Sequence, residues 1–384
     1  MILKKFPLLL FLLLLAACRE DEMVLSSTDQ STGGAPTSSS IKGFFLLNEG
    51  NMGSNKATLD YYDYETGIYS KNIYAERNPE VVKELGDVGN DLQIYGEKLY
   101  AVINCSNLVE VMDVKTAQHL HQLSIPNCRY ITFHEGYAYI SSYAGPVGLD
   151  PNARLGYVAK VDTATFALVD TCVVGYQPEE MQVVGNRLYV ANSGGYRAPN
   201  YDNTLSVIDL GTFKEIRKIP VAINLHRLEA DRFGNLYVSS RGNQKDVPSQ
   251  TYVIDTKTEQ VIQSLDLPNN QMTLCGDSLY CYGNTGKLAD PNKGIHFTLY
   301  DVLRQQIVKR QFTAEDVHLD LQNPYGIAVH PHSKEILITD AKNYVTPGKL
   351  HCLSAEGQLL WTVTTGDIPA HIAFTTHRLQ PLKK

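Results

Sequence analysis

The sequence predicts an all-β protein, a seven-bladed β-propeller with four-stranded antiparallel blades. Three observations indicate this fold: short strands that alternate apolar and polar residues, a repeated apolar pair in the second strand of each unit, and matching strands at the two chain ends. The pair recurs after 39, 50, 48, 43 and 57 residues, at Leu99-Tyr100, Ala138-Tyr139, Leu188-Tyr189, Leu236-Tyr237, Leu279-Tyr280 and Ile336-Leu337. Such spacing, with about four strands per unit, is typical of propellers.

The clearest unit runs from residue 180 to residue 220, with a Gly185-Asn186 tight turn after its first strand. Its strands are expected at 181–184, 187–192, 205–209 and 215–219. The turn before the fourth strand begins with an Asp, whose side chain can accept hydrogen bonds from backbone amides of its own turn. This Asp recurs, followed three positions later by Thr in all but the last case, at Asp113, Asp162, Asp209, Asp255 and Asp301.

The two ends of the chain are expected to share one blade. Six units begin near Val88, Cys128, Gln177, His226, Gln271 and Asn323. Residues 44–48 match a second strand that lacks a first strand, whereas residues 369–374 match a first strand that lacks a second. The C-terminal strand should therefore complete the first blade, which closes the ring and leaves no unpaired central edge.

The first 17 residues have the layout of a secretory signal, because Lys4 and Lys5 precede a Leu-rich run that is too short to span a bilayer. The signal ends in Leu15-Ala16-Ala17-Cys18, which resembles the lipobox of bacterial lipoproteins at all four positions. A lipidated Cys18 would be the mature N-terminus; an ordinary signal with an incidental Cys is the alternative. The acidic cluster at 19–22 resembles the surface-export signal of Bacteroidetes lipoproteins, so the expected location is the outer membrane, exposed at the cell surface.

Four segments are expected along the chain. Residues 1–17 form the lipoprotein signal peptide, 18–42 the lipidated Cys and a flexible tether rich in Ser, Thr and Gly, 43–377 the propeller, and 378–384 a C-terminal tail. The composition is globular, with 43% hydrophobic and 20% charged residues. Removal of the two signal lysines lowers the net charge from −7 to −9, which argues against nucleic-acid binding.

One face of the predicted ring carries the long loops. In an up-and-down blade, the loops between the second and third strands lie on the same face as the connections between blades. The long loops of this sequence belong to that set, at 48–55, 142–154, 192–203, 240–250, 283–294 and 340–348. The turns of the opposite face are minimal, such as Gly96-Glu97. Long loops on one side of a rigid scaffold are where function is usually carried.

The residues of the long-loop face suit a large, neutral ligand that forms hydrogen bonds. Aromatic rings, adaptable amides and a few cations provide such a surface. For each residue alone, a turn-forming or packing role is the alternative. The candidate ligand-binding residues are Asn51, Met52, Asn104, Arg129, Tyr130, Tyr143, Tyr176, Asn192, Tyr196, Arg197, His226, Arg227, Arg241, Asn243, Asn284, Tyr325, Lys342 and Tyr344.

An enzyme is the less favoured hypothesis. A lactonase-like or quinoprotein-like propeller would need metal ligands, or a catalytic carboxylate and His, that converge near the axis. The available groups are scattered one or two per blade, at Glu49, Asp87, Asp91, His226, Asp340 and His371. No catalytic residue, metal site or intrinsic cofactor is therefore expected. A scaffold or adhesin that binds protein or glycan through the same loops is the alternative from another class.

Six cysteines follow Cys18 in the sequence. An oxidising compartment would permit disulfides, although a core of this size does not need them. Cys105 and Cys128 fall on the long-loop face of neighbouring blades, which makes them the pair best placed for a bridge under the strict geometry that disulfides require.

The repeats resemble those of YVTN or YncE-type seven-bladed propellers across essentially the whole mature chain. The lipobox, the acidic cluster and the opening Phe45-Leu46-Leu47-Asn48-Glu49-Gly50-Asn51-Met52-Gly53-Ser54 also resemble surface lipoproteins of gut Bacteroidetes, a group that includes the BtuG-type cobalamin-binding lipoproteins. This resemblance implies capture of cobalamin (vitamin B12) and its hand-over to a TonB-dependent outer-membrane transporter of the BtuB type. It implies contact with the membrane through the lipid anchor only.

Overall fold

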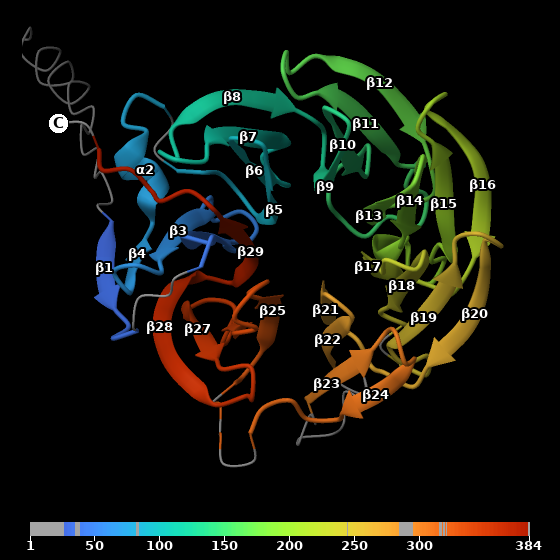
Figure 1. Cartoon of the computed structure of the whole chain (residues 1–384). Coiled ribbons are helices and arrows are strands. Elements are labelled where there is room, and N and C mark those ends of the chain that lie inside the picture. Colours follow the sequence, from blue (N-terminus) through green and yellow to red (C-terminus); the bar gives the residue numbers. More distant parts are fainter. Residues whose placement is uncertain are drawn as a thin grey trace, which may run out of the picture.

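The computed structural model describes residues 27–34, 39–81, 84–243, 245–283, 295–314, 317, 319 and 321–382. Within them the chain forms seven antiparallel sheets arranged in a ring, with the first strand of each sheet toward the centre and the fourth at the rim (Figure 1). The predicted fold class, a seven-bladed β-propeller, is confirmed. The signal peptide and Cys18 lie outside the described residues.

Blades 2 to 7 follow one another along the chain, and each contains four strands in sequence order. Their bounds are β5 (Gly89–Tyr95), β6 (Lys98–Ile103), β7 (Leu108–Asp113) and β8 (His119–Ser124) in blade 2; β9 (Cys128–His134), β10 (Tyr137–Ser142), β11 (Tyr157–Asp162) and β12 (Leu168–Val173) in blade 3; β13 (Pro178–Val184), β14 (Arg187–Asn192), β15 (Thr204–Asp209) and β16 (Lys214–Pro220) in blade 4; β17 (Leu225–Ala230), β18 (Asn235–Ser240), β19 (Gln250–Asp255) and β20 (Gln260–Leu265) in blade 5; β21 (Gln271–Cys275), β22 (Ser278–Gly283), β23 (His296–Asp301) and β24 (Gln306–Lys309) in blade 6; and β25 (Pro324–Val329), β26 (Ile336–Asp340), β27 (Pro347–Leu353) and β28 (Leu359–Asp367) in blade 7.

Blade 1 combines both ends of the chain, as the sequence predicts. Its strand order is β29 (Pro369–Thr375), β2 (Gly43–Asn48), β3 (Thr58–Asp63) and β4 (Ile68–Lys71) from the centre outward. Antiparallel pairs such as Phe44 with Phe374 join β2 to β29. The C-terminal strand therefore closes the ring.

A fifth strand, β1 (Thr28–Ser31), pairs with β4 on the outer edge of blade 1. The side chain of Gln30 also reaches blade 7: its Nε2 donates to the Thr364 carbonyl at 2.7 Å, and its Oε1 accepts from the Thr364 amide at 3.0 Å. The sequence-based expectation of a flexible tether across 18–42 is therefore wrong for residues 28–31. Backbone pairing and polar side chains, Gln30 and Asp29, hold this strand, so no apolar pattern marks it in the sequence.

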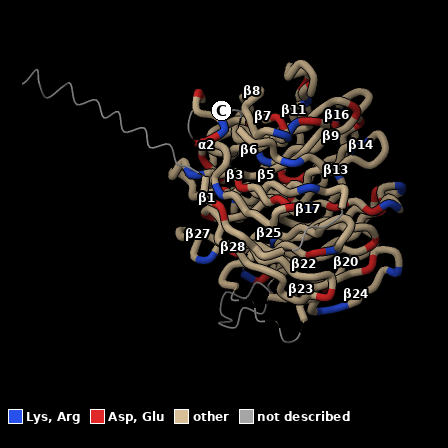
Figure 2. Tube along the Cα trace, turned by 60° about the vertical axis from the view of Figure 1, so that its left-hand side comes forward, with Lys and Arg blue, Asp and Glu red and all other residues tan. Residues whose placement is uncertain are grey.

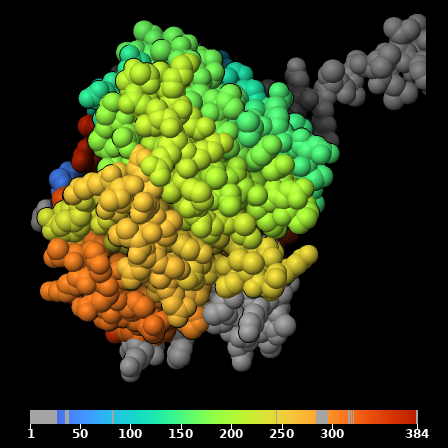
Figure 3. Space-filling view, turned by 90° about the vertical axis from the view of Figure 1, so that its right-hand side faces the viewer, coloured from blue at the N-terminus to red at the C-terminus, as the bar shows by residue number. Residues whose placement is uncertain are grey.

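The repeated apolar pair has a clear packing role. Tyr100, Tyr139, Tyr189 and Tyr237 are each about 1% exposed. Each lies in the hydrophobic cluster of the following blade, so that Tyr139 packs with Leu188 and Tyr189 packs with Leu236. Because successive residues of a strand point to opposite faces, one member of each pair faces the preceding blade and the other faces the next. At the surface, successive parts of the ring from green to orange lie against one another (Figure 3).

Two shorter features connect blade 1 to blade 2. Helix α2 (Ile73–Arg77) follows β4, and the hydroxyl of Tyr74 on this helix donates to the buried Glu110 carboxylate of β7 at 3.0 Å. The C-terminal tail is also bound, because Arg378 Nε donates to Asp63 at 2.8 Å and the Gln380 amide donates to the Lys115 carbonyl at 2.7 Å. The expected boundary at residue 378 therefore separates the strands from the tail but does not mark the end of the packed structure.

The predicted Asp turns are present. In blade 2, the Asp113 carboxylate accepts hydrogen bonds from the amides of Lys115 and Thr116 and from the Thr116 hydroxyl, and blades 3 to 6 repeat parts of this pattern. Acidic and basic residues are interspersed over the surface (Figure 2). None of the helices in the described ranges is long and apolar enough to cross a membrane.

Candidate ligand-binding site

A cavity of about 450 Å³ lies at the centre of the long-loop face, and all seven blades contribute to its walls. This volume falls within the range of small-molecule sites, about 300–1,000 Å³. The first strands converge on the axis, so the residues at their beginnings meet there together with the loops between second and third strands (Figure 1).

Eleven of the eighteen candidate residues line this cavity. They are Asn51, Met52, Asn104, Arg129, Tyr130, Tyr196, His226, Arg227, Arg241, Tyr325 and Tyr344. Asn284 lies outside the described residues. The structure therefore brings these eleven candidates together around one cavity, from six of the seven blades, and their contact with a ligand stays a prediction.

Six candidates have structural roles away from the cavity walls. Tyr143, 4% exposed, packs under Arg129 with its ring 4.8 Å from the guanidinium. Asn192 is fully buried and donates to Thr204 and Ser206. Tyr176 and Arg197 stack on each other at 3.5 Å.

The remaining two candidates stabilise their own loops. The Asn243 carbonyl oxygen accepts hydrogen bonds from the amides of Lys245, Asp246 and Val247. The Lys342 ammonium lies 2.9 Å from the Asp340 carboxylate. The expectation that these six residues line the site is therefore not met, because local partners already engage them.

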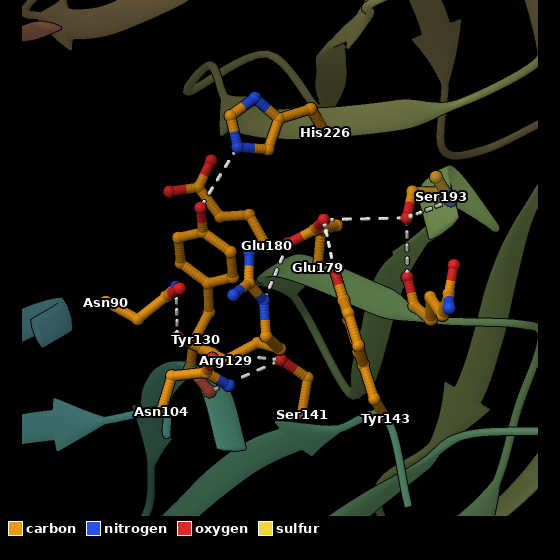
Figure 4. Close-up of polar contacts among 12 residues, drawn as sticks. Asn90, Asn104, Arg129, Tyr130, Ser141, Tyr143, Glu179, Glu180, Ser193 and His226 are labelled. Atoms are coloured by element: carbon orange, nitrogen blue, oxygen red, sulfur yellow. Dashed lines mark hydrogen bonds and ion pairs between the residues drawn. The ribbon is translucent and has the colours of Figure 1, made fainter. Parts of the chain in front are cut away.

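Glu179 is the centre of the polar network beneath the cavity (Figure 4). Its side chain is 1% exposed, and its carboxylate accepts hydrogen bonds from Arg129 at 3.2 Å and from the Tyr143 hydroxyl at 2.5 Å. Arg241 of blade 5 approaches it at 3.4 Å. Burial opposes ionisation of this carboxyl, but the two guanidinium groups outweigh burial and hold its pKa below the usual value. One carboxylate of blade 4 thus positions cations of blades 3 and 5.

His226 of β17 is held in a single neutral form. Arg241 Nη2 lies 2.6 Å from His226 Nε2, and the Tyr130 hydroxyl lies 3.0 Å from the same nitrogen. A guanidinium can only donate, so Nε2 accepts and the ring proton is on Nδ1. Burial and the neighbouring arginines lower the pKa of His226 well below its ordinary value, which agrees with a neutral ring.

Three cavity-lining side chains carry a buried polar atom with no hydrogen-bond partner in the described part of the chain. These atoms are His226 Nδ1, Arg227 Nε and the Tyr282 hydroxyl. The first two are donors, and a Tyr hydroxyl can donate as well. All three atoms are buried within the wall and do not face the open space of the cavity, so they are a cost to the folded protein and not contacts presented to a ligand.

The charges around the cavity are paired with one another. Arg129 and Arg241 share Glu179, and Arg227 lies 3.4 Å from Glu180, whose other oxygen accepts from the Leu228 amide at 2.7 Å. On the opposite wall Glu49 accepts from the Tyr325 hydroxyl at 2.8 Å and lies 3.2 Å from His371. The site therefore presents donors and aromatic rings without a large excess of positive charge.

Sequence reasoning did not assign the other residues that line the cavity to a ligand. They are Glu49, Gly50, Val88, Asn90, Cys105, Val147, Asn270, Gln271, Tyr282, Pro324 and Ile368. Glu179 was also missed, although it is the second residue of a first strand, as are Arg129, His226 and Tyr325. This shared position is the signal that could have identified it.

The cysteine prediction is wrong in the structure, where Cys105 and Cys128 are both free. Cys128 is fully buried, and its sulfur points to the carbonyls of Ile103 and Leu108 at 3.8 and 3.2 Å. Cys105 is partly exposed and its sulfur lies 3.5 Å from the Asn104 side chain. The two side chains are directed to different neighbours, one within the blade packing and one at the cavity wall.

The fold and the cavity define a seven-bladed β-propeller with a polar, aromatic depression on its long-loop face. A family model described as a domain of unknown function, DUF5074, matches residues 42–360, and the chain belongs to this family. Among solved structures, hydrazine synthase of Kuenenia stuttgartiensis is similar, with a TM-score of 0.60 and 15% identity over 74% of this chain and 89% of that chain. That likeness extends to the fold alone. No curated protein matches the sequence.

Proposed function

We propose that this protein is a non-catalytic, lipid-anchored surface lipoprotein that captures cobalamin on its long-loop face and passes it to a TonB-dependent outer-membrane transporter of the BtuB type. The resemblance to YncE-like propellers and BtuG-type lipoproteins suggests this ligand. The lipobox at Cys18 and the acidic cluster behind it support the location.

The amide and aromatic lining of the cavity, with its arginines already paired, carries the proposal. Amide side chains such as Asn51, Asn270 and Gln271 line the wall, while the arginines are neutralised by Glu179 and Glu180. A highly charged anion would gain little from paired cations, whereas a neutral molecule edged with amides can form hydrogen bonds with an amide lining. The corrin ring of cobalamin, which is edged with carboxamides, has this chemistry. Cobalamin is too large to enter this cavity of about 450 Å³ completely, so one part of the ligand would occupy it while the rest lies over the long loops, against aromatic rings such as Tyr325 and Tyr344, whose centroids are 6.0 Å apart.

The loop tips around the cavity support the partner in this proposal. Met52, Leu149 and Val345 are 66%, 81% and 70% exposed and belong to the long loops of blades 1, 3 and 7. A partner protein that docks on this face would remove these three apolar side chains from water. The same tips favour the second candidate function, a scaffold or adhesin that binds protein or glycan.

The acidic groups near the axis support a binding role more than a catalytic one. Asp91 accepts from the amides of Leu92 and Ile131 at 2.8 and 2.9 Å, and Asp340 accepts from the amide of Asn323 at 2.7 Å. Glu49 is engaged by Tyr325 and His371. These contacts use the carboxylates to fix the backbone and the aromatic rings.

Isothermal titration of the purified protein with cobalamin tests the proposal. Binding is expected, and Tyr196→Ala should weaken it by about 1–3 kcal/mol because it removes an aromatic wall of the cavity. Tyr201→Ala is the matched control, since Tyr201 is in the same loop but is not one of the residues that line the cavity. No heat and no thermal shift at saturating cobalamin would reject cobalamin as the ligand and favour the scaffold or adhesin function.

A further inference from the structure

Arg241 is the most accessible of the arginines that the structure places around the cavity. Its side chain is 35% exposed, compared with 11% for Arg129 and 9% for Arg227. The Nε of Arg227 is buried without a hydrogen-bond partner, whereas the Nε of Arg241, which also lacks one in the described part of the chain, is open to solvent. A ligand in the cavity can therefore bond to Arg241 without displacing a protein partner.

Two contacts fix the position of the Arg241 guanidinium at the cavity wall. Its Nη1 donates to Glu179 Oε1 at 3.4 Å, and its Nη2 donates to Nε2 of the buried His226 at 2.6 Å. The His226 ring is held in turn by the Tyr130 hydroxyl at 3.0 Å. A planar guanidinium has more N–H donors than these two contacts use, so the remaining donors are presented in a fixed orientation.

Glu179 cannot neutralise both guanidinium groups that contact it. Arg129 donates to Glu179 Oε2 through Nε at 3.3 Å and through Nη2 at 3.2 Å, whereas Arg241 contacts only Oε1, at 3.4 Å. Neither arginine has a second carboxylate within ion-pair distance in the described structure. By contrast, Arg227 has Glu180 as its own partner. One carboxylate for two cations leaves one positive charge, and this charge lies with the weaker contact, on the accessible Arg241.

A single positive charge on a fixed, accessible guanidinium suits a ligand group with one negative charge. Guanidinium groups bind phosphate oxygens through parallel hydrogen bonds, which gives the contact both strength and a defined geometry. Cobalamin is rich in uncharged amides but carries one anionic group, the phosphodiester that links its corrin ring to the nucleotide. We propose that Arg241 binds this phosphodiester, so that the nucleotide side of cobalamin faces the cavity. This inference rests on the proposed function and identifies the part of the ligand that the cavity recognises.

The test compares Arg241→Gln with the parent protein, using cyanocobalamin and dicyanocobinamide. The second corrinoid keeps the corrin ring but lacks the phosphodiester and the nucleotide. Arg197→Gln is the matched control, because it removes the same charge from the same face, but Arg197 stacks on Tyr176 and is not one of the residues that line the cavity. Isothermal titration measures each affinity, and melting temperatures show that both variants fold.

Arg241→Gln should bind cyanocobalamin about 10-fold more weakly than the parent, or weaker still, as expected for the loss of a hydrogen bond to a charged group. It should bind dicyanocobinamide as well as the parent does, and Arg197→Gln should match the parent with both corrinoids. Higher salt should weaken cyanocobalamin binding by the parent more than by Arg241→Gln, because salt screens a partly exposed ion pair.

Unchanged affinity of Arg241→Gln for cyanocobalamin would overturn the inference. An equal loss with both corrinoids, or an equal salt dependence in parent and variant, would also overturn it, because a general disturbance of the cavity wall produces those results. Absence of cyanocobalamin binding by the parent is a separate result, which would overturn the proposed function and this inference with it.

Discussion

Replacement of Glu179 by Gln should strongly destabilise the protein. Gln keeps the shape of the side chain but removes the charge that neutralises Arg129, whose side chain is 11% exposed. A buried pair that loses one partner typically costs about 3–5 kcal/mol, because the other charge remains buried and unpaired. Arg241 adds little to this cost, since its side chain is 35% exposed and water screens it. The loss is large against a typical domain stability of about 5–15 kcal/mol.

Glu97→Gln provides the control. Glu97 also pairs with a cation, Lys115, but its side chain is 70% exposed and water screens the pair, so its replacement should cost much less than that of Glu179. Urea denaturation at pH 7 measures both free energies of unfolding. If Glu179→Gln lies within about 1 kcal/mol of the parent, or matches Glu97→Gln, the assigned role of the Arg129 pair is wrong.

The same network predicts that the difference in unfolding free energy between the parent protein and Glu179→Gln depends on pH. The pKa of Glu179 is lower in the folded protein than in the unfolded chain, so the folded state binds fewer protons in the interval between the two values. Its contribution to stability is therefore complete above the ordinary Glu pKa and is lost as the pH falls through the lowered folded value. The difference between parent and variant should shrink in acid. A difference that stays constant from neutral to acid pH would contradict the ionised state of Glu179.

Four further outcomes are expected. Burial raises the pKa of Glu229 to about 8. The free energy of unfolding should therefore decline as the pH rises from the ordinary pKa of Glu to about 8, because the unfolded chain releases this proton first. Glu229→Gln should flatten that decline in urea denaturation measured from pH 5 to pH 9. Deletion of residues 366–384 removes β29 and the tail, and the loss of folding free energy should exceed the stability of a typical domain, about 5–15 kcal/mol. A truncated protein that melts near the parent temperature would refute the blade pairing. Gln30→Ala removes both hydrogen bonds to Thr364 and should speed proteolysis near residue 30, whereas unchanged cleavage would show that β1 is held by β4 alone. Cys18→Ser should shift the protein to soluble fractions or leave its signal uncleaved, which fractionation and mass spectrometry would detect.

The ring and its closure could be predicted because both depend on local, repeated patterns. In the Leu-Tyr pair of a second strand, one residue faces the preceding blade and the other faces the next. The match between residues 44–48 and 369–374 reveals a blade divided between the chain ends. The Asp turns are equally local, since the carboxylate of Asp113 bonds to amides two and three residues away. Patterns with a short range in sequence need no knowledge of tertiary structure.

The network under the cavity could not be predicted in the same way. Glu179 bonds to Arg129 and Arg241, which lie 50 and 62 positions away on the two neighbouring blades. Its role depends on which rotamers meet beneath the cavity, and no spacing rule encodes that. Tyr143 illustrates the complementary error: its loop position is right, but its ring is turned inward under Arg129. β1 was missed because Thr-Asp-Gln-Ser carries no apolar alternation.

The position of both chain ends on blade 1 has a consequence for engineering. Strand β1 lies on β4, and the tail bonds to residues of β3 and the β7–β8 turn, so the two ends lie on the same side of the ring (Figure 1). A ring of similar blades has no intrinsic starting point, and termini that lie near each other tolerate circular permutation. New ends opened in a short turn such as Gly185-Asn186, far from the cavity, would convert the divided blade into a continuous one. If Cys18 carries the proposed lipid, a permutant with the lipobox moved to its new N-terminus would be anchored at blade 4 and would present the cavity to the membrane from a new angle.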